Sequence, residues 1–240
     1  MKKTLLILAA LAAGASLRAD TATKGYSVTT DFTYASEYVF RGVQNAHDSF
    51  QPSVEVSSNG FGLGVWTNAP ITKHENNEVD FYGNYSYKMS DALSLEAVTT
   101  YYWYPEAATG GTRHSVESGV GATYNFEGFS PSVYAYYDFI LQAQTVQASI
   151  GYSIPLKDLA TSIDLSAYAG NVSANDFAPD ARGAKVKQSY EYYGGDLSLP
   201  YQLSTTAKLT AAVHYATNQN LPAGTLKDRV WYTLGATVGF

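Results

Sequence analysis

The last eleven residues of the chain, VWYTLGATVGF at 230–240, alternate between larger apolar side chains and smaller or polar ones. The apolar set is Val230, Tyr232, Leu234, Ala236, Val238 and Phe240. A period of two residues is the pattern of a β-strand, because successive side chains of a strand point to opposite faces. The first run of the chain has the same period, and its apolar set is Tyr26, Val28, Phe32, Tyr34, Tyr38 and Phe40.

This alternation recurs along the chain and predicts twelve strands. Their expected ranges are 25–41, 50–58, 61–68, 78–89, 93–103, 115–126, 130–142, 144–154, 162–171, 188–199, 204–217 and 230–240. Short turns and longer polar loops should alternate as the connections between successive strands. The longer loops are expected at 42–49, 68–77, 104–114, 172–187 and 218–229. A short connection near 142–144 is the exception. An even strand count with this alternation of connections is typical of outer-membrane barrels.

The predicted fold class is therefore all-β, a transmembrane antiparallel β-barrel of about 12 strands. Hydrocarbon offers no partner to backbone polar groups, so a sheet in lipid must close on itself. The alternative is a soluble β-sandwich or a lipocalin-like barrel, which would turn its apolar face inward. Twelve strands and 21 tyrosines exceed what those folds usually need.

Composition excludes several classes of protein. The 240 residues are 45% hydrophobic and 15% charged, with no cysteine. The only continuous apolar stretch, Leu5 to Ala13, is far shorter than the roughly 20 residues of a membrane-spanning helix. A formal charge of −6 argues against nucleic acid as a partner. The lack of cysteine excludes disulfides, a thiolate nucleophile and cysteine-ligated metal.

Residues 1–19 have the pattern of a secretory signal peptide, with Lys2 and Lys3 before the apolar stretch and small residues after it. Residues 20–240 would then form the barrel, in the outer membrane of a Gram-negative bacterium. The carboxyl end, with Phe240, Val238 and Tyr232 at alternate positions, resembles the outer-membrane assembly signal. Expected partners are outer-membrane lipid and the barrel-assembly machinery.

In a membrane barrel the apolar members of each run face lipid and the others face the lumen. The lumen and selectivity candidates are Asp31, Glu37, Arg41, Glu55, Asp80, Lys88, Glu96, Glu117, Asp138, Asp164 and Lys208, with Asp196 of the same parity. Acids dominate this set, and an acidic wall favours cations over anions. The alternative is a paired polar plug that conducts nothing.

Aromatic residues support two further interpretations. Lumen parity also falls on Tyr82, Tyr102, Tyr134, Tyr136 and Tyr168, which either stack on a sugar or nucleoside or simply fill space. The tryptophans at 66, 103 and 231 lie at strand ends expected outside, where aromatic rings form an interfacial girdle. Parity would also let Trp66 and Trp231 narrow the outer mouth of the lumen.

Three short motifs carry a resemblance to a known family. They are Tyr38-Val39-Phe40-Arg41-Gly42, the glycine-rich stretch from Gly60 through Trp66 to Asn68, and Glu78-Val79-Asp80. Together they resemble the TorF-type porin family, first catalogued as a conserved hypothetical family of Gram-negative bacteria. Members often carry Ser or Thr before Gln in the first loop, where this chain has Val43. The resemblance implies an outer-membrane barrel and a pore, with no catalytic residues to transfer.

Arg41 is expected at the outer end of the first strand, near Glu37. Its guanidinium could pair across the barrel with Glu55 or Asp80 and hold a loop, or it could contact solute. Gly42 would permit the positive φ of a sharp exit from the strand.

Nothing in the sequence indicates an enzyme, a metal site or a cofactor. Three histidines, His47, His74 and His114, fall in predicted loops, and His214 has lumen parity without a serine partner on a lipid-facing position. We therefore expect an outer-membrane channel for passive diffusion of small hydrophilic solutes, with a preference for cations. The alternative is a closed-lumen barrel with a structural or surface-interaction role.

Overall fold

The computed structural model describes residues 25–107, 111–156, 159, 161–174, 188–221 and 228–240. The expected signal peptide, most of the loop predicted at 172–187 and half of the loop predicted at 218–229 lie outside these residues. The strands are β1 Ser27–Ala35, β2 Tyr38–Phe40, β3 Val43–Ala46, β4 Ser49–Ser58, β5 Phe61–Pro70, β6 Glu78–Lys88, β7 Leu93–Trp103, β8 His114–Tyr124, β9 Phe129–Asp138, β10 Ala143–Leu156, β11 Thr161–Ala174, β12 Gln188–Gln202, β13 Ala207–Gln219 and β14 Arg229–Gly239. No helix in this part of the chain is long and apolar enough to cross a membrane.

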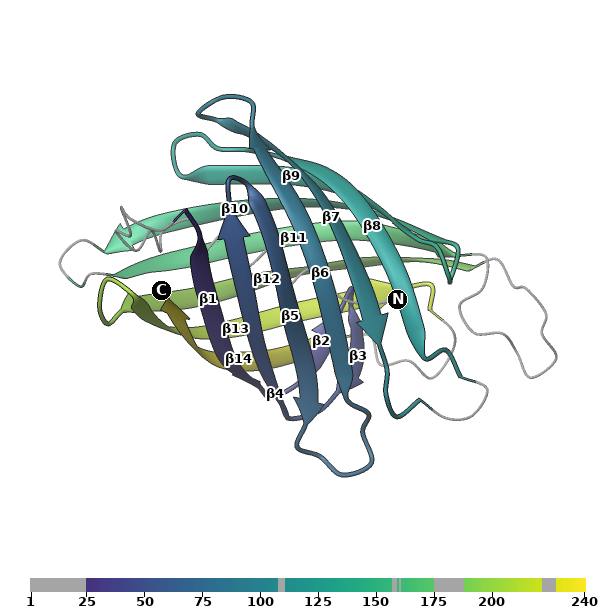
Figure 1. Cartoon of the computed structure of the whole chain (residues 1–240). Helices are drawn as coiled ribbons and strands as arrows, with labels where there is room; N and C mark the ends of the chain where they lie inside the picture. Colours follow the sequence, from purple (N-terminus) through teal and green to yellow (C-terminus); the bar gives the residue numbers. More distant parts are fainter. Residues whose placement is uncertain (1–24, 108–110, 157–158, 160, 175–187, 222–227) are drawn as a thin grey trace.

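Twelve of these strands form one closed antiparallel barrel, in which each strand pairs with its neighbour in sequence once β2 and β3 are set aside (Figure 1). The first and last strands close it, with Asp31 opposite Thr237. Closure pairs every strand of the described barrel sheet on both of its sides. The prediction of an all-β, twelve-stranded barrel is confirmed.

The two ends of the barrel differ in their connections. The end that carries Ser27 and Phe240, called the terminal end below, has connections of two to four residues at 59–60, 89–92, 125–128, 157–160 and 203–206. The other end, called the hairpin end, carries the longer connections at 36–48, 71–77, 104–113, 175–187 and 220–228, with the short 139–142. The predicted alternation of short turns and longer loops is confirmed, including its exception.

The expected first strand, 25–41, is wrong in its second half. Strand β1 ends at Ala35, and the chain turns into the separate β2–β3 hairpin, in which Phe40 pairs with Val43. Arg41 and Gly42 form its turn with φ of 49° and 74°, and two successive positive φ values suit a tight hairpin turn. The hairpin strand β2 has the same two-residue period as β1, so the alternation continues past Ala35. Alternation alone therefore cannot show where β1 ends.

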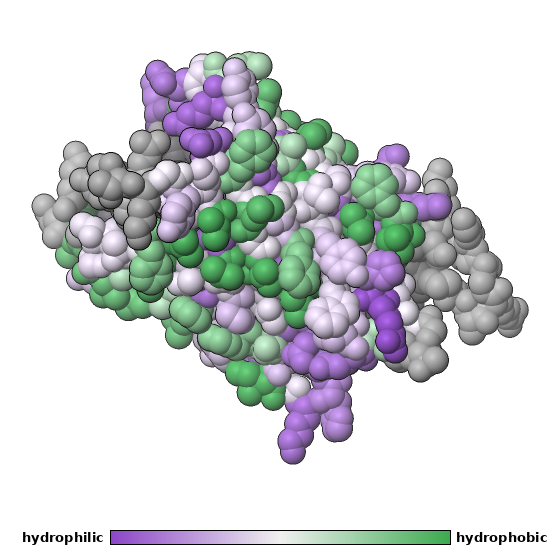
Figure 2. All heavy atoms as spheres, in the orientation of Figure 1, coloured by the Kyte–Doolittle hydropathy of each residue, from purple (hydrophilic) through white to green (hydrophobic). Residues whose placement is uncertain are grey.

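The outward face of the barrel is apolar at mid-height and aromatic near both ends. Val54, Leu63, Val120 and Leu234 are 41%, 70%, 62% and 54% exposed on this face. Exposed aromatic rings lie towards the terminal end (Phe61, Tyr87, Tyr124, Tyr152 and Tyr201) and towards the hairpin end (Phe50, Tyr101, Trp103, Tyr137, Tyr193 and Tyr215). Figure 2 shows apolar side chains across the strands, with hydrophilic ones gathered towards the ends. This banding is that of a barrel built for lipid.

Most of the predicted lumen tyrosines cover glycines of the neighbouring strand. Their cross-strand pairs are Tyr82 with Gly64, Tyr136 with Gly119, Tyr134 with Gly121 and Tyr168 with Gly194, and Tyr192, which the sequence analysis does not name, covers Gly170 in the same way. A Cβ at Gly119 would lie 2.0 Å from Cδ1 of Tyr136, so the ring occupies the space of the missing side chain. Such pairing stabilises a glycine-containing strand. These tyrosines are therefore part of the wall, which favours the space-filling interpretation over a stacking surface.

Candidate functional site

The β2–β3 hairpin lies inside the barrel and fills the lumen near the hairpin end. At its tip, Arg41 donates two hydrogen bonds to Glu117 of β8, from Nη1 to Oε2 at 2.8 Å and from Nη2 to Oε1 at 3.0 Å. Both side chains are almost fully buried, at 2% and 4% exposure. The hydroxyl of Tyr102 donates to the same carboxylate at 3.2 Å. A buried, two-point ion pair of this kind positions its members tightly.

The other side of the tip is seated on β12 and β13. The amide of Asn218 donates to the carbonyl oxygen of Gly42 at 2.6 Å. A Cβ on Gly42 would lie 2.7 Å from the carbonyl oxygen of Thr217 and 2.9 Å from Cβ of Tyr192. Glycine is therefore required twice at this position, for its positive φ and for the close approach of the wall.

Two groups of aromatic and apolar residues hold the sides of the hairpin. The rings of Tyr38 and Trp66 lie 5.6 Å apart, in a buried cluster that includes Phe40 and Tyr82. On the other side Val43 packs against a buried cluster of Tyr168, Val172, Tyr190 and Tyr192. Tyr38 and Phe40 are each 2% exposed, so their expected lipid-facing placement is wrong. Within the described residues the lumen is filled at this level.

Below the hairpin, towards the terminal end, acidic side chains are gathered on the lumen wall, and this acidic part of the lumen is called the vestibule below. It is lined by the half-buried acids Asp31, Glu55, Glu96, Asp164 and Asp196. Hydroxyl groups bind four of them, at 2.8 Å from Thr237 to Asp31, 2.7 Å from Tyr134 to Glu96, 2.6 Å from Ser153 to Asp164 and 2.5 Å from Ser166 to Asp196. The basic residue among them is Lys208, which is attracted by Asp31 and Asp164. Acidic groups outnumber basic ones in this vestibule.

One histidine of the vestibule wall, His214, contacts one of these acids. His214 Nδ1 lies 2.7 Å from Asp196 Oδ1, and its Nε2 lies 2.9 Å from the hydroxyl of Thr233. The imidazole stacks on Trp231 at 5.0 Å between ring centres. Trp231 and Trp66 therefore both point into the lumen, as their parity predicts. Trp103 instead is 42% exposed on the outward face.

The predicted lumen residues fall into separate groups. The vestibule contains Asp31, Glu55, Glu96, Asp164 and Lys208, and the level of the hairpin contains Arg41, Asp80, Glu117 and Asp138. Glu37 pairs with Arg229 at 3.5 Å beside the hairpin base. Lys88 is exposed at the terminal end of β6.

Two of these residues have contacts that parity alone did not indicate. Arg41 pairs with Glu117, a partner that the sequence analysis did not name, because the hairpin carries the guanidinium across the lumen. Asp138 accepts hydrogen bonds from Ser115 and from the backbone N–H groups of Ile140 and Leu141, so it caps the 139–142 turn. Asp138 is thus nearly fully buried, unlike the half-buried acids of the vestibule.

The motifs that carry the family resemblance converge on the hairpin. Tyr38, Phe40, Arg41 and Gly42 form it, and Trp66 contacts it. Asn68 accepts a hydrogen bond from Gln51 in the wall beside it, at 2.9 Å, and Glu78 and Asp80 are buried at the same level. Gly60 is the exception, because it forms a turn with φ of 86° at the terminal end. Sequence reasoning missed the seat on the Thr217 backbone and the Asn218 side chain, for which the signal was the lumen parity of the polar Asn218.

Loops at the hairpin end are tied to one another. Glu75 accepts a hydrogen bond from the backbone N–H of His47 at 2.8 Å and lies 2.5 Å from its Nδ1. This hydrogen bond and the negative charge of Glu75 raise the pKa of the His47 imidazole above its ordinary value. Glu106 similarly binds the backbone and side chain of Asn77, both at 2.7 Å. In the described ranges no group of three or more His, Asp or Glu side chains could hold a metal ion.

Comparisons with known proteins agree with this architecture. A family model described as "Bacterial protein of unknown function (Gcw_chp)" matches residues 19–133, a little under half of the chain. This segment includes the hairpin and all three motifs. No curated protein sequence matches the chain.

Solved structures of bacterial porins resemble the barrel along almost its full length. A NanC porin is 13% identical with a TM-score of 0.56, over 88% of this chain and 98% of its own. The KdgM porin is 14% identical with a TM-score of 0.54, over 88% and 99%. The chain shares the fold of outer-membrane porins. LpxR from Salmonella typhimurium, 8% identical with a TM-score of 0.51 over 88% and 99%, has a similar fold.

Proposed function

We propose that this protein is an outer-membrane channel, of the TorF type, for passive diffusion of small hydrophilic solutes, with a preference for cations. The observation that carries the proposal is the acidic vestibule inside a closed barrel of porin fold. Carboxylates along a low-dielectric wall attract cations and repel anions. Diffusion through such a lumen needs no cofactor and no catalytic residue.

The proposal includes location and orientation. The apolar outward band and its two aromatic girdles support insertion in the outer membrane of a Gram-negative cell. The longer connections of such barrels face the outside, so the hairpin end would be extracellular and the vestibule would open to the periplasm. Residues 1–19 would be removed as a signal peptide, and the terminal Phe240 would be read by the barrel-assembly machinery.

The hairpin would set the size limit of the channel. Its tip touches β8 on one side and β12 and β13 on the other, so passage requires the hairpin to move or a narrow route beside it. We infer that the conducting state has the tip released from Glu117 or Asn218. Small solutes are then favoured over large ones.

The charge of the vestibule argues against acidic sugars as cargo. One porin of similar fold is described as KdgM in complex with disordered oligogalacturonate, at 12% identity and a TM-score of 0.52. An oligogalacturonate carries one carboxylate on each sugar, and Asp31, Glu55, Glu96 and Asp164 would repel it. A likeness of fold therefore does not extend to that ligand.

The alternative remains a barrel whose lumen stays closed and which has a structural or surface role. The nearly complete burial of Tyr38, Phe40 and Arg41 favours it. Planar-bilayer conductance of the refolded mature protein, in a salt gradient, decides between the two. Discrete steps with a cation-side reversal potential support the channel, whereas a folded, heat-modifiable barrel without conductance supports the closed alternative.

A further inference from the structure

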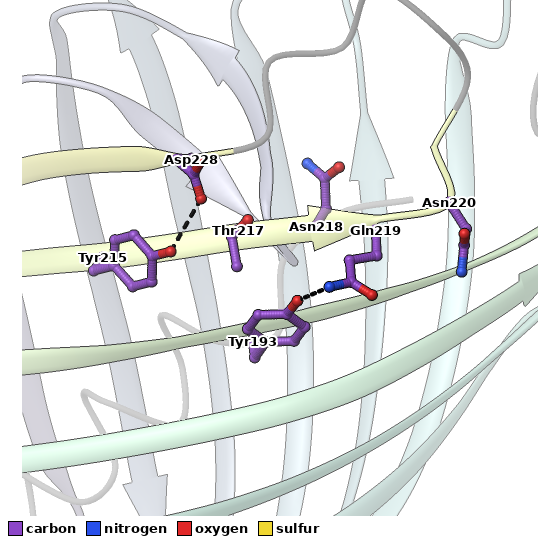
Figure 3. Close-up of a pocket in the computed structure, with 7 residues that line it drawn as sticks. All are labelled: Tyr193, Tyr215, Thr217, Asn218, Gln219, Asn220 and Asp228. Carbon is purple, nitrogen blue, oxygen red and sulfur yellow. Dashed lines mark hydrogen bonds between the residues drawn. The ribbon is translucent and has the colours of Figure 1, made fainter.

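A second concave site lies on the outward wall, behind the seat of the hairpin. It is a pocket of about 380 Å³ at the hairpin end of β12, β13 and β14. Tyr193, Tyr215, Thr217, Gln219, Asn220 and Asp228 line it, together with Asn218 (Figure 3). This volume lies within the roughly 300–1,000 Å³ of small-molecule sites.

The pocket faces the membrane side of the wall. Along β12 and β13, the inward residues Tyr192 and Asn218 are buried, whereas Tyr193 and Tyr215 are 37% and 42% exposed. Figure 3 shows Asn218 pointing away from Gln219, as expected for neighbours on a strand. The exposed apolar residues of the same strands, Leu197, Leu199 and Val213, lie nearer the terminal end. The pocket therefore lies where the apolar band gives way to polar residues.

Polar groups in the pocket are arranged around the two tyrosines. The hydroxyl of Tyr215 donates to Asp228 at 3.0 Å, and the amide of Gln219 donates to the hydroxyl of Tyr193 (Figure 3). At the rim, the amide of Asn220 donates to Glu191 at 2.6 Å. The side chains described on this outward face contain a carboxylate, Asp228, and two amides, Gln219 and Asn220, but no lysine or arginine. This set is unfavourable for a phosphate group, which needs positive charge.

We propose that this pocket binds a sugar ring of a glycolipid in the outer leaflet. Sugar hydroxyls both donate and accept, so they match a carboxylate that accepts and amides that do both. The faces of Tyr193 and Tyr215 can pack against the apolar C–H face of a sugar while their hydroxyls stay polar. The depth of the site, at the edge of the apolar band, is that of a lipid headgroup. The proposal rests on the outer-membrane location but not on conduction.

One short segment of β13 connects this pocket to the hairpin. Thr217 and Gln219 line the pocket, while the backbone of Thr217 and the amide of Asn218 contact Gly42 on the inner face. A sugar bound outside would contact Thr217, which with Asn218 seats the hairpin tip on its inner side. Occupancy should therefore favour the seated hairpin, since a ligand stabilises the state that it binds.

The test uses the full mature protein in nanodiscs of phosphatidylethanolamine and phosphatidylglycerol, with and without rough lipopolysaccharide. Native mass spectrometry measures the lipopolysaccharide retained by the parent, by a Tyr193→Ala/Tyr215→Ala variant, and by Tyr101→Ala as a control. Tyr101 is 40% exposed at the same end on β7. Loss of two ring contacts should weaken binding about tenfold, and Tyr101→Ala should leave it unchanged.

Each outcome has a definite meaning. Equal losses in the pocket and control variants, with both folded by heat-modifiability, would overturn the proposal, because the tyrosines would then act only as an interfacial girdle. Soluble core oligosaccharide tests the source of the sugar. Its binding at the pocket, without retention of lipopolysaccharide, would overturn the lipid source and assign the pocket to free saccharides. Absence of binding by either probe would overturn the site.

Discussion

Arg41 and Glu117 form a buried ion pair between residues 76 apart in sequence, with the guanidinium at the tip of an internal hairpin and the carboxylate on the barrel wall. The guanidinium carbon also lies 5.1 Å from the centre of the Tyr136 ring and 4.7 Å from that of Phe40. Arg41 is thus held by a carboxylate and by two aromatic faces. These contacts join the tip of the hairpin to the barrel wall.

Removing one member of this pair should cost more than removing both. Arg41→Ala leaves the Glu117 carboxylate buried without its main partner, and such single losses cost roughly 3–5 kcal/mol. The Arg41→Met/Glu117→Met double variant should recover much of this loss, because no charge then stays buried. Urea unfolding of the refolded barrels, followed by tryptophan fluorescence, measures both. Equal losses in the single and double variants would contradict the ion-pair interpretation.

The same variants separate a gate from an anchor in conductance. If the seated tip limits passage, Arg41→Ala should raise single-channel conductance while the barrel stays heat-modifiable. Unchanged conductance in a folded Arg41→Ala channel would mean that ions pass elsewhere. The Lys88→Ala variant is a suitable control, because Lys88 is exposed at the terminal end and away from the hairpin.

Gly42→Ala should displace the hairpin tip. The added Cβ meets backbone and Cβ atoms of the wall at 2.7 and 2.9 Å, and the positive φ of 74° is unfavourable for alanine. Overpacking and strain of this kind cost roughly 1–3 kcal/mol each. Gly25→Ala is a matched control, because nothing lies within 4 Å of its Cβ position. Faster hydrogen exchange in β2 and β3 than in the control would confirm the close seat, and equal exchange would refute it.

The contact between His47 and Glu75 should make one loop sensitive to pH. Since Glu75 raises the pKa of His47, protonated histidine is favoured in the folded protein. The ion pair between His47 and Glu75 is fully formed below the ordinary histidine pKa of about 6.5. It is lost as the pH rises through the raised pKa of His47. The protection factors of the amides at 71–77, which are corrected for the intrinsic rise of exchange with pH, should therefore fall at higher pH. His47→Gln should abolish this dependence, and its persistence in that variant would assign it to another group.

The barrel wall could be predicted from the sequence, but the hairpin could not. Alternation placed Glu117, Glu96 and Tyr134 correctly on the lumen side, because a strand in a barrel has only two faces. It failed after Ala35, since Tyr38 and Phe40 continue the period while the chain leaves the wall. The one local signal was the positive φ expected at Gly42, which was interpreted as a strand exit and not as a turn inside the lumen.

The seat of the hairpin lay beyond any local pattern. Gly42 and Asn218 are 176 residues apart, and their contact depends on how deep the hairpin reaches into a closed barrel. The true partner of Arg41 was missed for the same reason, although Glu117 was placed on the correct face. The alternation along a strand shows that a residue faces the lumen but not how far along the barrel axis it lies. The sequence therefore could not distinguish the charged residues of the vestibule from those at the level of the hairpin.

That separation gives the sharpest test of the proposed selectivity. Glu96→Gln and Asp164→Asn remove vestibule charges and keep the size of each side chain and much of its hydrogen bonding to Tyr134 or Ser153. Each should move the reversal potential in a salt gradient towards zero, and the double variant should move it further. Asp138→Asn is the matched control, because this carboxylate caps a turn at 1% exposure and lies outside the vestibule. A larger shift from Asp138→Asn than from Glu96→Gln would place the selective step beside the hairpin and contradict the vestibule as the filter.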